Sequence, residues 1–272
     1  MNTQNIMIKL TIRSATQLLS ILLSLTLFSL SSISQAAPEK LVVCADKGYW
    51  YPFVFTEGYE AKGLYIDMLN DAADRLDMKV SIRPMDWKKC LRKARAGKVD
   101  GIIGVSYKDK RAEYLEYPAD AKTKKFSDLR LTQVEYVVVN NASSPYVFDG
   151  NVTTLPQPVR VPRGYSVADD LKNEGISDVN TKSKGDHGTL LRLISEKNGS
   201  VVTLATVAKH FEQHRLFKGK IKTQKRAYKS KSYFMAFSKK RPTDEASRNE
   251  IWDALTAVRT DSVLMETYMA KY

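Results

Sequence analysis

Cysteine and histidine side chains are the first candidates for chemistry in this sequence, because both can bind metals or act in catalysis. The chain has two cysteines, Cys44 and Cys90, and three histidines, His187, His210 and His214. Structural zinc sites usually take four such ligands at close, regular spacing, which these residues lack; the interval between His210 and His214 fits a solvated helix face. We expect no metal site and no cofactor, while an oxidising compartment would permit a disulfide.

Two glycine-led segments in the second half of the chain could bind a negatively charged group. They are Gly164-Tyr165-Ser166 and Gly185-Asp186-His187-Gly188-Thr189, and each precedes a helical sequence. A helix N-terminus exposes free N–H groups and favours anions. Ser166 and Asp186 are therefore candidate binding residues, and the alternative is that each only caps its helix.

Carboxylates that could serve as a general acid are few. The candidates are Glu57, Asp67 and Asp186, and none forms a recognisable pair with a base. The sequence also has no Ser-His-Asp order typical of a hydrolase. We therefore expect no enzymatic activity from these residues.

The N-terminus predicts a cleavable signal peptide, residues 1–36. Two basic residues precede an apolar run at 18–30, and the small residues of 34–37 suit signal peptidase. A membrane anchor is the alternative, but a spanning helix needs ~20 apolar residues and this run is shorter. A lipoprotein is less suitable, because Cys44 lies well beyond the apolar run. We expect export to the periplasm.

Composition is that of a globular protein with an excess of basic residues. The formal charge of the 272 residues is +13, and loss of Lys9 and Arg13 with the signal peptide leaves +11. The basic residues are spread along the chain, without a nucleic-acid-binding motif beside them. We expect a solvated basic surface and no nucleic-acid partner; a protein that binds cell-wall or other polyanions is an alternative that rests on charge alone.

The exported part alternates between short apolar runs and segments with helical spacing, which predicts α/β layers with a parallel sheet. It is long enough for one large domain or two small ones. The expected strands are 41–45, 80–83, 99–105, 135–139, 159–162, 201–204 and 232–237, and the expected helices are 64–78, 87–96, 167–175, 190–197, one capped by Thr243 or Asp244, and 263–270.

A series of short motifs resembles bacterial periplasmic solute-binding proteins of family 3, the receptors of polar amino-acid type uptake systems. The resemblance covers nearly all of the exported chain and is strongest over 41–118. It implies a type 2 periplasmic-binding-protein fold, with two α/β lobes joined by two crossing strands and a small solute held between them as a monomer. The implied lobes are 38–132 with 238–272, and 133–237. The motifs are Gly63-Leu64-Tyr65-Ile66-Asp67, Asp86-Trp87, Gly97-Lys98-Val99-Asp100, Ser106-Tyr107-Lys108-Asp109-Lys110-Arg111 and Glu116-Tyr117-Pro118.

One subgroup of that family has a Trp-Lys/Arg-x-Cys-Leu helix, which Trp87-Lys88-Lys89-Cys90-Leu91 matches. That subgroup often pairs this cysteine with one in the first strand. The resemblance therefore implies a Cys44–Cys90 disulfide, and the alternative is two buried free thiols.

The resemblance also implies roles for site residues. In amino-acid-binding relatives the arginine that matches Arg111 holds the ligand carboxylate, which a planar guanidinium suits. Ser106 would supply a hydroxyl, and Gly104 would let the backbone approach the ligand; the alternative for Arg111 is an exposed loop residue. Aromatic walls could come from a further set, with core packing as the alternative: Tyr51, Phe53 and Trp87.

One departure from the family concerns the second lobe. Amino-acid receptors usually carry an aspartate after a Gly-Arg-x-Asp strand, and residues 198–207 contain no carboxylate. An α-amino acid is therefore in doubt, and the expected ligand is a small polar solute, with a carboxylate-bearing one left open. The partner would be an ABC-transporter permease, unless the protein is an orphan sensor. A dehydratase-like enzyme on the same scaffold is the alternative.

Overall fold

The computed structural model describes residues 40–241 and 243–272, which belong to one compact unit. The predicted signal peptide, residues 1–36, lies outside the described residues. Within the described ranges, no helix has the length and apolar character that a membrane span requires.

Parallel strands form the sheet of the first lobe. β1 (Leu41–Asp46) lies between β4 (Val80–Met85) and β5 (Gly101–Ser106). Because the strands run in the same direction, Asp46 and Ser106 end at the same edge of the sheet, where α/β folds place their ligands. The other elements of this lobe are β2 (Phe55–Glu57), β3 (Glu60–Lys62), α2 (Leu64–Arg75), α3 (Trp87–Arg95), α4 (Asp109–Ala112), β6 (Leu115–Glu116), α8 (Glu245–Thr260) and α9 (Ser262–Ala270).

The second lobe repeats this design with shorter strands. β10 (Ser200–Leu204) pairs in parallel with β8 (Val159–Arg160), which pairs in parallel with β9 (Val179–Asn180). Loops lead from the ends of β8 and β9 into α5 and α6; the sequence predicts both glycine-led loops and β8, but not β9. The other elements are η2 (Val152–Thr154), α5 (Val167–Asn173), α6 (Asp186–Glu196) and α7 (Ala205–Gln213).

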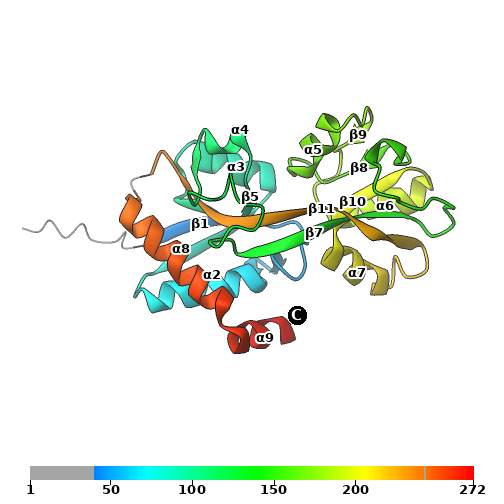
Figure 1. The fold of residues 1–272 in the computed structure, drawn as a ribbon. Helices are drawn as coiled ribbons and strands as arrows, with labels where there is room; N and C mark the ends of the chain where they lie inside the picture. Colours follow the sequence, from blue (N-terminus) through cyan, green and yellow to red (C-terminus); the bar gives the residue numbers. More distant parts are fainter. Residues whose placement is uncertain (1–39, 242) are drawn as a thin grey trace, which may run out of the picture. The chain divides into compact units, whose positions relative to one another are not determined.

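Two long antiparallel strands, β7 (Thr132–Asn141) and β11 (Ile221–Ser238), join the lobes. β11 pairs with β7 up to Tyr233 and with β5 from Tyr233 onward, and β7 pairs with β10. The sheet order is therefore β4-β1-β5-β11-β7-β10-β8-β9, and Figure 1 shows both long strands passing through the two lobes. This is the two-lobed fold that the resemblance implied, whereas the proposed lobe bounds stay a prediction.

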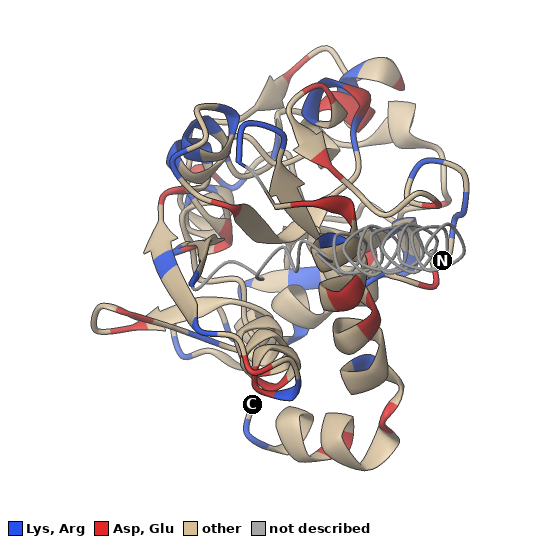
Figure 2. Ribbon diagram, turned by 90° about the vertical axis from the view of Figure 1, so that its left-hand side faces the viewer, with Lys and Arg blue, Asp and Glu red and all other residues tan. Residues whose placement is uncertain are grey.

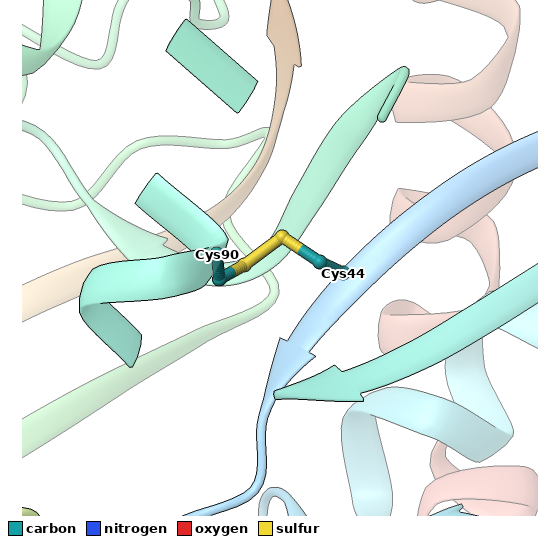
Figure 3. Close-up of a disulfide and its surroundings, with 2 residues drawn as sticks. All are labelled: Cys44 and Cys90. Atoms are coloured by element: carbon teal, nitrogen blue, oxygen red, sulfur yellow. A yellow bond between two sulfur atoms is a disulfide. The ribbon is translucent and has the colours of Figure 1, made fainter. Parts of the chain in front are cut away.

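A disulfide holds α3 against the first-lobe sheet. It joins Cys44 on β1 to Cys90 on α3, with 5.7 Å between the two Cα atoms (Figure 3). Both cysteines are fully buried, among apolar residues that include Ile102 and Val105. The disulfide implied by the family resemblance is therefore present, and the structure has no free cysteine.

The helix caps follow the sequence only in part. Asp244 caps α8 as predicted, since its side chain accepts a hydrogen bond from the Ser247 N–H at 2.9 Å. Asp86 precedes α3 but makes no side-chain cap; its carboxylate instead pairs with Lys47 at 3.1 Å and with Lys184 at 3.5 Å. Opposite charges nearby thus take the place of the expected cap.

The sequence-based analysis missed several short elements and two longer ones, α7 and the first half of β11. α7 directly follows β10, and no Gly or Pro separates strand from helix. The first half of β11, residues 221–231, is rich in lysine and lacks apolar alternation. Its pairing with β7 stabilises it instead, and that long-range contact leaves little local signal.

Basic and acidic residues are interspersed over the molecule. Figure 2 shows Lys and Arg positions next to Asp and Glu positions on many helices and loops. Several are ion pairs, such as Lys124 with Asp128 at 2.7 Å. This distribution fits the predicted solvated basic surface.

Candidate functional site

A cavity lies where the two lobes meet. Its solvent-accessible volume is about 20 Å³, within about 350 Å³ of space between atoms that includes its opening to solvent. Residues from the ends of β1 and β5 and from the loop before α5 contribute to it. The lining residues are Asp46, Trp50, Val54, Trp87, Ile103, Gly104, Ser106, Arg111, Tyr165, Ser166 and Tyr233.

Arg111 on α4 is buried beside this cavity, with 7% of its surface exposed. Its guanidinium donates to the backbone carbonyl of Ser106 at 3.0 Å and to the Ser106 hydroxyl at 3.1 Å. It also donates to the carbonyl of Gly164 at 3.1 Å, in the second lobe. The cation lies 5.4 Å from the centre of the Trp87 ring. Arg111 is thus a fixed, buried cation, and the alternative of an exposed loop residue is wrong.

Hydroxyl groups from both lobes meet next to this cation. The Ser106 and Ser166 Oγ atoms lie 2.8 Å apart, and both side chains are buried. Ser166 precedes α5 but makes no side-chain cap, so its hydroxyl is directed to the other lobe. Together with Arg111, these hydroxyls can donate hydrogen bonds to an anionic group such as a carboxylate.

The loop before α5 enters the first lobe. The indole N–H of Trp87 donates to the Gly164 carbonyl at 3.0 Å. Gly164 has a φ of +85°, which favours glycine. The Tyr165 hydroxyl donates to the Asp46 carboxylate at 3.0 Å. Three consecutive residues of the second lobe therefore contact first-lobe groups that line the cavity.

Asp46 is a buried carboxyl at the end of β1. The N–H of Gly48 donates to its Oδ1 at 2.9 Å. Burial raises the pKa of Asp46 to about 6, against the lowering effect of the Gly48 and Tyr165 hydrogen bonds; the nearby Asp86 charge raises it further. The cavity thus presents an acidic group as well as Arg111.

Gly104 forms one wall of the cavity at an irregular point of β5. The register with β11 shifts between Phe234 and Met235, and Gly104 has a φ of +77°. A Cβ atom there would lie 3.0 Å from the Tyr65 ring and 3.2 Å from the Trp50 ring. Only glycine fits this bulge without strain or displacement of a ring.

The other predicted site residues have different positions. Asp186 is the first residue of α6, after the N-cap Gly185, and it makes no side-chain cap; it is 1% exposed and does not line the cavity. Phe53 packs in the core against Trp50 and Tyr65, as the alternative had it. Tyr51 lies against the His210 ring, with the ring centres 4.3 Å apart. The structure thus groups five of the eight predicted residues around the cavity: Gly104, Ser106, Arg111, Trp87 and Ser166.

Sequence reasoning missed several cavity residues. Asp46 directly follows a predicted strand, and this position at a strand end was a usable signal. Tyr165 lies between two residues that the helix-start pattern singled out. Tyr233 comes from the middle of β11, where it bonds to the Tyr136 hydroxyl, and no local pattern indicates such a position.

The fold and the cavity between its lobes define a two-lobed solute-binding protein. The chain belongs to the bacterial extracellular solute-binding proteins, family 3, whose family model matches residues 41–271. No curated protein matches the chain.

Solved structures share the fold at low identity. A histidine kinase sensor domain with similarity to periplasmic binding proteins has a TM-score of 0.72 at 17% identity, covering 86% of this chain and 95% of that chain. The substrate binding protein of an amino acid ABC transporter has a TM-score of 0.64 at 19% identity, with 86% and 98% covered. The arginine-, lysine-, histidine-binding protein ArtJ from Geobacillus stearothermophilus has a TM-score of 0.67 at 18% identity, with 85% and 94% covered.

Proposed function

We propose that this protein is a periplasmic receptor that captures a small polar solute between its two lobes. Membership of an extracellular solute-binding family supports the binding role, and the predicted signal peptide supports the location. The solute would lie in the cavity at the lobe junction, where groups from both lobes can contact it. Closing of the lobes around it would remove water from its polar contacts.

The buried guanidinium of Arg111 is the observation that carries this proposal. Its bonds to Ser106 fix it in the first lobe, while its contact with the Gly164 carbonyl reaches the second. An anionic group of the solute would bind the guanidinium and the hydroxyls of Ser106 and Ser166. Trp87 and Trp50 would supply flat walls.

The partner would be an ABC-transporter permease, or a signalling protein if the receptor is a sensor. Solved structures of both kinds share the fold. Because their sequence identity to this chain is below 20%, they do not distinguish a transport partner from a signalling partner. We propose a binding protein and not an enzyme, because the family and most neighbours are binding proteins.

A thermal-shift screen of amino acids, organic acids, polyamines and peptides tests the proposal. A solute at 100 times its dissociation constant adds roughly 2.7 kcal/mol of stability, which raises the unfolding temperature by several degrees. We expect at least one class of small polar solute to do so. If none does, while salt-sensitive binding to cell-wall polyanions is found, the polyanion alternative replaces the receptor.

A further inference from the structure

We propose that the outward side of α3 binds reversibly to the headgroups of an anionic phospholipid bilayer. The inference goes beyond the proposed receptor function, because it assigns a surface where the protein meets a membrane and not a solute. This surface, the basic face, consists of Lys88, Lys89, Arg92, Lys93, Arg95 and Lys98, with Lys240 beside them.

Cations are concentrated on α3 without acidic residues among them. Residues 87–98 contain six basic residues and no acidic residue. Across residues 40–241 and 243–272, only Arg95 among these six pairs with a carboxylate, that of Glu113 at 3.7 Å. α3 therefore differs from the many helices and loops on which Figure 2 shows basic and acidic residues side by side.

Helical periodicity gives α3 one buried side and one basic side. Trp87, Cys90 and Ala94 are buried against the first-lobe sheet, and the basic residues fall at the intervening positions of the helix. α2 and α8 cover the other side of the same sheet (Figure 1). The basic face is therefore directed away from the body of the first lobe.

The charges of this face do not favour the helix that carries them. Like charges four residues apart destabilise a helix, as for Lys88 with Arg92 and Lys89 with Lys93. Cations in the last turn, which include Arg95, are favoured by the helix dipole. Lys88 and Lys89 lie in the first turn, where the same dipole opposes them and no acidic residue is present. A local arrangement that costs stability points to an anion supplied from outside.

Neighbouring segments do not supply the missing negative charge. Asp86, directly before α3, already pairs with Lys47 at 3.1 Å and Lys184 at 3.5 Å. After β11 the chain returns to the end of α3, where a Cβ on Gly97 would lie 2.9 Å from the Cβ of Lys240. This contact brings a further exposed lysine to the basic face.

The disulfide fixes α3 with its basic face outward. Cys90, on the buried side of the helix, is bonded to Cys44 of β1, and both cysteines are fully buried. The apolar side of α3 therefore cannot turn toward a bilayer and insert. Binding would be electrostatic, reversible and weakened by salt, which suits a receptor that also has to leave the membrane to collect its solute.

Composition favours a headgroup surface over a protein partner. Protein interfaces place aromatic and apolar residues at their centre and are depleted in lysine. None of the exposed large hydrophobic side chains belongs to residues 87–98. Anionic bilayers instead attract clusters of roughly four to eight Lys and Arg residues, which the basic face matches.

Co-sedimentation with large unilamellar vesicles measures this binding. The protein is the exported chain from residue 38 onward, so that the apolar run at 18–30 cannot contribute. The vesicles contain phosphatidylcholine alone or with about one third phosphatidylglycerol, and the NaCl concentration is about 50 mM or about 300 mM.

A matched pair of variants separates the basic face from the overall charge. The first variant combines three exposed, unpaired positions of that face, Lys89→Gln, Arg92→Gln and Lys98→Gln. The control removes the same charge from exposed lysines of the second lobe, with Lys209→Gln, Lys218→Gln and Lys220→Gln. Because all six side chains lie at the surface, we expect both variants to fold and to bind the solute like the wild type.

We expect the wild type to bind the phosphatidylglycerol vesicles at the lower salt and to leave them at the higher salt. The α3 variant should lose at least ~30-fold in vesicle affinity, and the control no more than ~3-fold. Equal losses for the two variants would assign the binding to overall charge and overturn the proposal. Equal binding to both vesicle types would overturn it as well. Binding of poly-L-glutamate without binding of vesicles would assign the basic face to an acidic protein instead.

Discussion

The hydroxyl of Tyr165, in the second lobe, donates a hydrogen bond to the carboxyl of Asp46, in the first, at 3.0 Å. The Asp46 side chain is buried, that of Tyr165 is half-buried, and both border the cavity between the lobes. The hydrogen bond therefore links the stability of the lobe junction to the protonation state of Asp46.

Replacement of Tyr165 by phenylalanine tests this relationship. The change leaves one oxygen of Asp46 without its donor, so we expect a loss of about 1–2 kcal/mol in the free energy of unfolding and a further rise in the pKa of Asp46. Urea unfolding measures the first effect. Tyr146→Phe removes a more exposed hydroxyl that bonds to Thr154 at 3.0 Å, and equal losses for the two variants would contradict the account.

The two buried carboxyls predict a pH-dependent stability. Burial raises the pKa of Asp186 to about 7 and that of Asp46 to about 6, whereas both ionise near pH 4 in the unfolded chain. Between these values the folded protein holds more protons, so the stability that the pair contributes is fully present below about pH 4 and is lost as the pH rises through 6 and 7.

Thermal unfolding of the wild type and of Asp186→Asn between pH 5 and pH 8 isolates this effect. Burial lowers the pKa values of His187 and His210, which affects stability with the opposite sign, but the variant retains both histidines. We expect the stability of Asp186→Asn, relative to that of the wild type, to increase as the pH rises. A difference that stays constant with pH would mean that Asp186 does not titrate in this range.

Gly104→Ala probes the bulge that shapes the cavity. Alanine at a φ of +77° is strained, and its Cβ would press on the Tyr65 and Trp50 rings at 3.0 and 3.2 Å. Gly175→Ala, at a φ of +93° with no atom within 4 Å, carries the strain alone, about 1–2 kcal/mol. Chemical denaturation should therefore show a larger loss in the free energy of unfolding for Gly104→Ala than for Gly175→Ala. We also expect Gly104→Ala to bind the solute more weakly. Similar losses for the two variants would contradict the proposed contact with the Tyr65 and Trp50 rings.

The Cys44–Cys90 disulfide closes a loop with a sequence separation of 46. A constraint of this size on the unfolded chain stabilises the protein by roughly 2–4 kcal/mol. Reduction, or the double change Cys44→Ser and Cys90→Ser, should lower the free energy of unfolding by that amount, which is measured as a lower midpoint of urea unfolding. Mass spectrometry after thiol labelling without reductant checks the bond itself, and quantitative labelling of both cysteines would show that it is absent.

The first lobe could be predicted from the sequence because its elements are local and regular. Apolar runs around Val43 and Ile102 gave β1 and β5, and helical spacing gave α2. The second half of the fold was harder, since β11 at Lys222–Lys231 depends on pairing with β7 and not on its own pattern.

The site shows the same division between local and long-range information. Arg111, Ser106 and Gly104 come from a single strand and loop, and motif order indicated them together. Asp186 was singled out as a helix-start residue, but its contact with Thr203 and its position near Asp46 arise from the meeting of two lobes. No spacing along the chain encodes that meeting.

The central claim is that Arg111 holds an anionic group of a solute between the lobes. Isothermal titration of the solute found by the screen, with the wild type, Arg111→Ala and the control Arg95→Ala, tests it most directly. Arg95 is an exposed arginine of the same lobe, with 60% of its side chain accessible. The account predicts a loss of affinity of about 100-fold for Arg111→Ala, because the buried charged contact is removed, and no change for Arg95→Ala. Equal affinity of Arg111→Ala and the wild type would contradict it.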